Sequence, residues 1–278
     1  MRPGRVYCHI MDARSVGRWA ASYARAWEQR NPDAVVELFT PDATYRSSIF
    51  DAPHTGSAEI HAYWQRATST QADVRVWMGA PLVDGERAAI EWWTVMSDEG
   101  ERVTLPGCLL LEFDGERCAR LNEYWHSEPG AAEPYEGWGR ITDGDAERTR
   151  DAAARWIRGW KAGWEALDPA PIVAAYAPDA VHRSMPLRAP EDGGVAGYLA
   201  RCFPDESDVR SRFEVWAASG AQALTVYVAT LNDSAEGGDV TIASCDVLRF
   251  GDDGLCTEQR DYWNVAPRRV PDGEGWPS

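Results

Sequence analysis

Two carboxylates, one in each half of the sequence, have a residue type and spacing that suit acid–base chemistry. Glu123 lies in the run NEYW and Asp261 in the run RDYW. If these runs are β-strands, alternate side chains share a face, which places Glu123 beside Trp125 and Asp261 beside Trp263. A carboxyl group next to a buried indole is desolvated, which raises its pKa and suits proton transfer. We predict that Asp261 and Glu123 are catalytic. The alternative is that each is paired with an arginine on the pocket floor.

A second group of polar residues precedes these carboxylates on another expected strand. Tyr45 and Ser47 lie two residues apart in the first half and would share one face of a strand. His182 and Ser184 lie at the matching places in the second half. Hydroxyl groups or an imidazole at such positions hold a water molecule or a carbonyl oxygen, and His182 could titrate near neutral pH. The pattern predicts catalytic roles for Tyr45 and His182 and substrate contacts for Ser47 and Ser184. Capping of the strand end is the alternative.

The other predicted substrate contacts are mainly aromatic. An aromatic-lined cavity favours a flat, apolar or polyunsaturated ligand. Glu91 lies between apolar neighbours on a central strand, where a free charge is costly, so it either faces the pocket or is paired. Beyond the two serines, the predicted substrate-binding residues are Tyr23, Glu91, Trp93, Trp125, Trp160 and Trp263.

The candidates match in pairs because the sequence repeats itself. An offset of 137 residues carries Trp19 onto Trp156, and after one inserted residue an offset of 138 carries Trp125 onto Trp263. A repeat that covers most of a chain of 278 residues predicts two tandem domains. The predicted domains are residues 12–142 and 145–278.

Two smaller features recur at the same offsets. The run EGW ends at Trp138 in the first repeat and at Trp276 in the second, so each of these indoles is expected to dock onto the protein. Cys108 and Cys245 also match, which fits small apolar fillers at equivalent core positions.

Each repeat is expected to begin with a helix. Trp19, Tyr23 and Trp27 lie at i, i+4 and i+8, which places three rings on one helical face. A short second helix, a strand at 43–47 and a third helix near 59–66 follow. Longer strands are expected at 74–77, 88–96, 103–113 and 118–126. Helices first and antiparallel strands afterwards indicate an α+β fold, with three helices on the N-terminal side packed in a curved, mostly antiparallel sheet.

The residues that lead from the second helix to the first strand carry a family resemblance. The first repeat has AVVELFTPDA at 34–43 and the second has IVAAYAPDA at 172–180. With the order of elements, these runs resemble the nuclear transport factor 2-like, or SnoaL-like, superfamily. The resemblance implies two tandem cone-shaped α+β barrel domains. Because single-domain relatives commonly pair through their sheet faces, it also implies an intrachain pseudo-dimer, and hence a monomer or a dimer of fused pairs.

One enzyme of this superfamily, ketosteroid isomerase, matches only in part. There a helix tyrosine and a strand aspartate form the oxyanion hole, and an aspartate on the first strand is the base. Tyr23 matches the tyrosine, but the base position is Ser47 and the second acid falls near Leu109. In the second repeat the tyrosine becomes Trp160 and the base position Ser184. A serine does not abstract a carbon-bound proton without a base of its own, so this isomerase chemistry is not expected.

The second repeat is more similar to limonene epoxide hydrolase. That family has a YxNMPL segment that holds the water and an RDYF segment with an essential aspartate. This chain has HRSMPL at 182–187 and RDYW around Asp261. The hydrolase's RxD on a central strand has no counterpart at 224–231. SnoaL-like polyketide cyclases need only one pocket carboxylate beside aromatic walls, and Glu123 and Asp261 lie on the right strand for it.

Together these residues predict a cofactor-independent enzyme that uses a pocket carboxylate as general acid and base on an apolar or aromatic small molecule. The expected reactions are cyclisation or aldol closure, then dehydration or isomerisation, then epoxide opening. The superfamily also contains non-catalytic binders, so a small-ligand-binding or accessory protein is the alternative.

Charge and composition argue against several other classes. The formal net charge of −16 argues against nucleic-acid and anionic-membrane partners. The sequence has no apolar run long enough to span a membrane, and the residues before Met11 lack the apolar core of a signal peptide. A cytoplasmic location is therefore expected, with translation starting at Met1 or Met11. Cysteines and histidines do not lie at metal-ligand spacing, so we expect no metal and no other cofactor.

Overall fold

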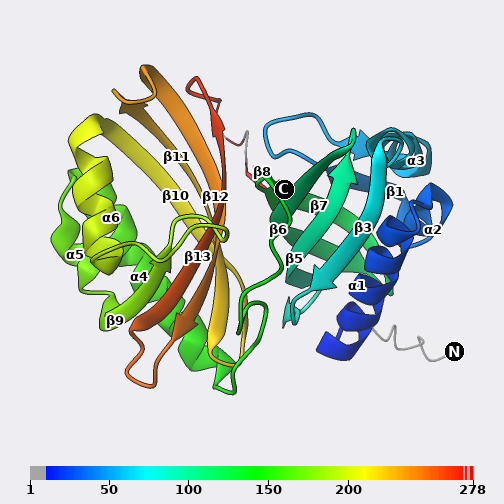
Figure 1. Cartoon of the computed structure of the whole chain (residues 1–278). Coiled ribbons are helices and arrows are strands. Elements are labelled where there is room, and N and C mark those ends of the chain that lie inside the picture. Colours follow the sequence, from blue (N-terminus) through cyan, green and yellow to red (C-terminus); the bar gives the residue numbers. More distant parts are fainter. Residues whose placement is uncertain (1–10, 272, 274–275, 278) are drawn as a thin grey trace, which may run out of the picture.

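The computed structural model describes residues 11–271, 273, 276 and 277, which form two α+β units in succession (Figure 1). The helices of the first unit are α1 (Ala13–Glu28), α2 (Pro32–Val36) and α3 (Gly56–Ala67). Its strands are β1 (Phe39–Arg46), β2 (His54–Thr55), β3 (Gln71–Met78), β4 (Leu82–Asp84), β5 (Arg87–Asp98), β6 (Glu101–Asp114), β7 (Arg117–Trp125) and β8 (Glu128–Pro129).

The second unit repeats this plan. Its helices are α4 (Ala146–Ala166), α5 (Pro169–Val173) and α6 (Gly194–Cys202), followed by the short 3-10 helix Phe203–Asp205. Its strands are β9 (Tyr176–Arg183), β10 (Glu206–Ser219), β11 (Gln222–Asp233), β12 (Gly238–Phe250) and β13 (Cys256–Ala266). The predicted fold class, two tandem cones of the α+β type, is confirmed.

Side-chain caps start the helices α1, α2, α4 and α5, whereas α3 and α6 begin without one. The Asp12 carboxylate accepts a hydrogen bond from the backbone N–H of Ser15 at 2.7 Å and starts α1. Asn31 caps α2, whose first turn contains Pro32. Asp145 caps α4, which confirms the helix expected at this point. These local signals fix the helix starts because the first N–H groups of a helix otherwise lack a partner.

The sheets place the last strand of each unit next to the first. The order is β2-β1-β7-β6-β5-β3 in the first unit and β10-β11-β12-β13-β9 in the second. The pairs β1–β7 and β9–β13 are parallel, while the hairpin pairs are antiparallel. The helices lie against one face of each sheet (Figure 1). Side chains of the first strand, the last strand and the first helix therefore meet inside each cone.

The first strand begins earlier than the sequence predicted. It was expected at 43–47, but β1 starts at Phe39. The reason is a tertiary pairing: Phe39 lies beside Cys118 of β7, and the backbone N–H of Cys118 donates to the carbonyl oxygen of Leu38 at 2.9 Å. Pairing with β7, which is distant in the sequence, therefore extends β1 beyond the residues whose local pattern predicted a strand.

The two units pack sheet to sheet. Figure 1 shows the helices on the outer sides and the two sheets facing each other in the middle. Their shared core includes Leu110 and Tyr124 from the first unit and Val226 from the second. Cys108 and Cys245 are fully buried in the same core, as expected of apolar fillers. The contact buries this face of each sheet within the chain.

Glu91 and Trp93 lie at this interface, so their predicted place in a substrate pocket is wrong. The Glu91 carboxylate accepts hydrogen bonds from the Arg260 guanidinium at 2.7 and 2.8 Å and from the Tyr262 hydroxyl at 2.7 Å. The Trp93 ring packs on Trp138, with centroids 5.7 Å apart. Odd-numbered side chains at the centre of β5 face the other unit, and even-numbered ones face the cone interior. Glu91 is therefore paired across the interface, the alternative that its sequence context left open.

Both tail indoles dock onto the protein, as predicted. Trp138 is 8% exposed and Trp276 is 7% exposed. The Trp276 ring joins the core between the units, and the Arg212 guanidinium lies 3.7 Å from its centroid. Residues 274–275 of the second EGW run, and the predicted alternative start at Met1, lie outside the described residues. In the described part of the chain, no helix is long and apolar enough to cross a membrane.

Candidate functional site

Two tyrosine hydroxyls hold Glu123 in the first cone. The residues come from three elements: Tyr23 from α1, Tyr45 from β1 and Glu123 from β7. Tyr45 donates to Glu123 Oε1 at 2.7 Å and Tyr23 donates to the same oxygen at 3.0 Å. The two hydroxyl oxygens lie 2.9 Å apart. The fold thus brings together three of the predicted site residues, and Glu123 is bound by hydroxyl groups instead of an arginine.

Aromatic rings close around this carboxyl group. Tyr63 packs on Tyr45 with ring centroids 5.1 Å apart, and Trp64 packs on Tyr23 at 5.4 Å. Burial raises the pKa of Glu123 to about 7, although the two hydroxyl donors act in the opposite direction. Glu123 is therefore enclosed by rings and has little contact with solvent.

Glutamine in place of Glu123 is expected to weaken the pH dependence of stability. The pKa is about 7 in the folded protein against 4.5 for a free carboxyl group, so between these values only the folded chain binds the proton. Stability conferred by the protonated group is full below pH 4.5 and falls as the pH rises to about 7. The free energy of unfolding is expected to fall by about 3 kcal/mol over this range.

The measurement is urea unfolding of both proteins at pH 5 and at pH 8. We expect the wild type to lose more free energy of unfolding between the two pH values than Glu123→Gln. Equal losses would show that Glu123 does not take up a proton on folding.

Ser47 and Trp125 lie at the edge of the same cone. The Trp125 indole N–H donates to the Ser47 carbonyl oxygen at 2.8 Å, and both residues are partly exposed. The bond ties the end of β7 to the chain that follows β1. Their predicted role as substrate contacts stays a prediction.

In the second cone, Asp261 faces another carboxyl group instead of tyrosines. The pairing of β12 with β13 places Asp246 directly opposite Asp261, and both are buried. Asp246 accepts hydrogen bonds from the Ser244 hydroxyl at 3.0 Å and from the Thr225 hydroxyl at 3.2 Å. Asp261 accepts one from the Gln259 amide at 2.6 Å. The site is thus a carboxyl pair with hydrogen-bond donors on both members.

The two carboxyl groups lie at facing positions of paired strands, so the charge of one affects the pKa of the other. Burial raises the pKa of Asp246 to about 7. Burial, and then the charge of Asp246, raise the pKa of Asp261 well above its usual range. Two adjacent buried carboxyl groups cannot both ionise without a large cost. The pair therefore retains a proton at neutral pH.

Sequence reasoning missed Asp246, although the repeat contained a signal for it. The offset that relates Cys108 to Cys245 also relates Leu109 to Asp246. In the first unit Leu109 lies opposite Glu123, just as Asp246 lies opposite Asp261. A charged residue that replaces an apolar one at a matching buried position is the signal that could have identified it.

The second cone contains a cavity that ends on this pair. Its inner chamber has a volume of only about 20 Å³ and is lined mainly by rings and carboxyl groups, among them Trp156, Trp160, Trp164, Tyr198, Tyr227, Glu206, Asp246 and Asp261. An outer chamber of about 360 Å³ shares Tyr198, Glu206, Tyr227 and Asp261 with it and extends past Ser184 and Trp263. Four predicted site residues therefore line one cavity: Asp261, Trp160, Ser184 and Trp263.

One pair of facing residues differs in size between the two cones. Trp92 lies opposite Gly107, and a Cβ atom on Gly107 would come within 2.3 Å of the indole. At the matching place in the second unit, Tyr227 lies opposite Ser244. The smaller ring leaves space, and the Ser244 hydroxyl binds Asp246.

His182, predicted to be catalytic, is fully buried beside the carboxyl pair. Its Nε2 lies 4.0 Å from Asp261 Oδ2, and its ring centroid lies 4.8 Å from that of Tyr198. Neither ring nitrogen has a hydrogen-bond partner among the described residues. Burial lowers the pKa of His182 to about 4, so the expectation that it titrates near neutral pH is wrong. At pH 7 it is a neutral imidazole.

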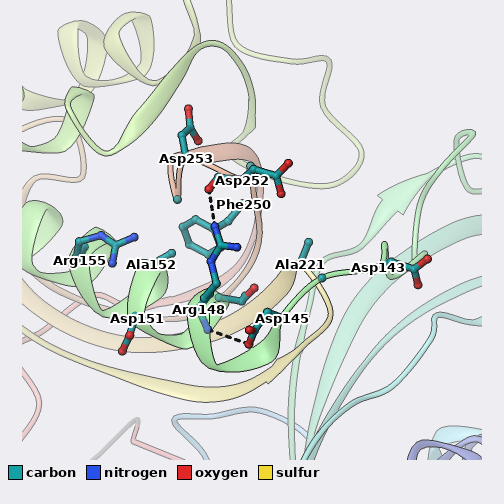
Figure 2. Close-up of a pocket in the computed structure, with 14 residues that line it drawn as sticks. Asp143, Asp145, Arg148, Asp151, Ala152, Arg155, Ala221, Phe250, Asp252 and Asp253 are labelled. Atoms are coloured by element: carbon teal, nitrogen blue, oxygen red, sulfur yellow. Dashed lines mark hydrogen bonds between the residues drawn. The ribbon is translucent and has the colours of Figure 1, made fainter.

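A second hollow lies where the chain enters the second unit (Figure 2). Arg148 donates to the carbonyl oxygen of Asp252 at 2.8 Å, and its backbone N–H donates to the capping carboxylate of Asp145 at 3.3 Å. These bonds fix the start of α4 against the β12–β13 turn. The hollow holds none of the residues predicted for catalysis, so its contacts are structural.

A family model for the SnoaL-like domain matches residues 20–121 and 153–259. The chain therefore belongs to the SnoaL-like domain family and contains two copies of the domain. A search of curated proteins finds no match.

Solved structures with a similar fold each cover about one unit of this chain. One is a hypothetical protein with a ketosteroid isomerase-like fold from Catenulispora acidiphila DSM 44928 in complex with trimethylamine, at 26% identity over 38% of this chain and 83% of that chain, with a TM-score of 0.36. Another is the epoxide hydrolase/cyclase-like enzyme SalBIII of salinomycin pyran-ring formation, at 20% identity over 41% and 93%, with a TM-score of 0.38. A third is a limonene epoxide hydrolase-like enzyme from M. tuberculosis, at 17% identity over 41% and 84%, with a TM-score of 0.36.

Proposed function

We propose that the second cone is an acid–base active site for a small carbonyl compound with an apolar body, and that it works without a cofactor. The observation that carries the proposal is the buried Asp246–Asp261 pair at the end of an aromatic cavity, because two adjacent buried carboxyl groups favour retention of a proton. A carboxyl group that is protonated at neutral pH can give its proton to a substrate oxygen and take one back.

The reaction follows from the proton balance of the pair. Asp261 gives its proton to the substrate carbonyl oxygen, which leaves two adjacent buried carboxylates. Because that state is costly, the pair regains a proton from the carbon next to the carbonyl group. The substrate is now an enol and the pair has its original proton. The enol carbon can then attack a second carbonyl of the same molecule, which closes a ring by an aldol step.

Gln259 is the residue that orients Asp261. Its amide nitrogen donates to Asp261 Oδ1, and its amide oxygen accepts from the Tyr176 hydroxyl, which fixes the direction of the amide. Tyr176 in turn accepts a hydrogen bond from the Trp160 indole at 2.8 Å. This series of hydrogen bonds holds one carboxyl oxygen of Asp261. The other oxygen is directed towards His182 and the cavity.

In this proposal the first cone is a structural partner. Its sheet covers the outer face of the catalytic sheet, and its own carboxyl group is enclosed by rings. Because the pairing face is already covered within the chain, we propose a monomer or a dimer of fused pairs. The closed first cone also favours a second candidate, a protein that binds a small ligand in the second cone without transforming it.

Exchange of carbon-bound hydrogen in D2O distinguishes the two candidates. The full chain is incubated with 1,3-diketones, enones and short poly-β-ketones, and deuterium incorporation is followed by mass spectrometry. We expect faster incorporation next to a carbonyl group than in buffer with the same carboxylate concentration. Binding of these compounds without faster incorporation would favour the ligand-binding candidate and refute the acid–base proposal.

A further inference from the structure

The cavity of the second cone has an unusual balance of charge. Its inner chamber contains the carboxyl groups of Glu206, Asp246 and Asp261, and neither lysine nor arginine is among its lining residues. None of the three forms an ion pair with a lysine or arginine among the described residues. An anionic ligand would be repelled there, and a neutral one would leave the carboxyl groups with only neutral hydrogen-bond donors from neighbouring side chains.

Two arginines, Arg188 and Arg201, line the outer chamber, and both are already engaged with other side chains. Arg201 donates to Glu191 at 2.8 Å, and its guanidinium lies 5.4 Å from the Tyr198 ring. Arg188 is exposed and donates to the Ser184 hydroxyl at 3.5 Å. Asp205, Asp233 and Glu236 also line the outer chamber. The way into the cavity therefore carries an excess of negative charge.

The walls between these carboxyl groups are aromatic. Trp164 packs on Trp160 with centroids 6.1 Å apart and on Tyr227 at 5.6 Å, and its indole N–H donates to Glu206 at 2.6 Å. Ring faces attract cations, and the attraction grows where water is excluded. Buried carboxyl groups set among ring faces are complementary to an alkylammonium group.

We propose that the ligand of the second cone carries an alkylammonium head, which sits between Glu206 and Asp261 against the rings of Tyr198 and Tyr227. This inference rests on the proposed function, since it names the substrate class for the same site. The cation offsets the cost of burying the one negative charge that the Asp246–Asp261 pair carries beside its proton, and the apolar body of the ligand fills the rest of the outer chamber.

A pair of ligands with the same shape and different charge tests the inference. Choline and 3,3-dimethylbutan-1-ol differ only in the charged nitrogen that replaces a carbon. Titration calorimetry on the full chain is expected to give choline an affinity at least about tenfold higher than that of the alcohol. Equal affinities, or no binding of choline at about 10 mM, would overturn the proposal.

A substitution in the cavity and a matched one outside it locate the site. Glu206→Gln is expected to weaken choline binding about tenfold and to leave the alcohol unaffected. Glu116→Gln makes the same change in net charge at an exposed turn of the first unit and is expected to change neither affinity. Equal effects of the two variants would assign the preference to overall charge and refute the site. If Glu206→Gln does not fold, the affinities of the wild type for the two ligands still decide whether the cavity prefers a cation.

The comparison of binding affinities does not depend on whether the protein turns over a substrate. Charge discrimination without deuterium exchange would support the ammonium site and refute the acid–base proposal. Deuterium exchange with neutral ketones, together with equal binding of choline and the alcohol, would support the acid–base proposal and refute the ammonium site.

Discussion

Asparagine in place of Asp261 is expected to lower turnover by about 10²–10⁴-fold while ligand affinity stays within about tenfold. The variant keeps the shape of the side chain and its bond from Gln259, but it has no proton to give to the substrate. Turnover of the compound that exchanges fastest in D2O, and its dissociation constant by calorimetry, are the measurements.

Asp246→Asn provides a graded comparison at the same pair. It removes the negative charge that helps to raise the pKa of Asp261, so Asp261 loses its proton at lower pH and turnover at pH 7 falls about tenfold to a hundredfold. Glu123→Gln makes a similar change in the closed first cone and is expected to retain turnover. Intact activity in both aspartate variants, or loss of activity in Glu123→Gln alone, would move the chemistry out of the second cone.

Methionine in place of Arg260 is expected to cost about 3–5 kcal/mol of unfolding free energy. Glu91 is 5% exposed, and the change leaves its buried carboxylate with only the Tyr262 hydroxyl as a partner. Because the pair joins β13 to β5 of the other unit, the loss should appear as weaker association of the two sheets. Urea unfolding measures the free energy, and intrinsic fluorescence reports exposure of the interface indoles.

Two further variants isolate the pair. The double variant Glu91→Met with Arg260→Met is expected to recover most of the loss, because neither charge of the pair remains. Glu258, which also binds Arg260, keeps its ion pair with Arg249. Arg75→Met removes one member of an exposed pair with Glu133, where both side chains are at least 60% exposed, and should cost at most about 1 kcal/mol. A cost for Arg260→Met as small as that for Arg75→Met would show that the buried pair contributes nothing to joining the units.

The alternation of polar and apolar residues predicted correctly which side chains of β13 share a face. It did not predict which way the side chains of β5 point. Alternation placed Asp261 and Trp263 together, and both line the cavity. On β5, residues 88 to 96 are all buried, because one face covers the cone interior and the other covers the second unit. A strand buried on both faces has no polar–apolar alternation, so nothing local shows which way Glu91 points.

The sequence by itself determined the repeat, the α+β order of elements, the helix starts at capping residues and the family resemblance. These features depend on contacts within a few residues or on direct comparison of two segments. The tertiary structure alone decided that Asp246 lies opposite Asp261, that two hydroxyls bind Glu123 and that burial keeps His182 neutral. Strand register and burial set these properties, and both arise from residues far apart in the sequence.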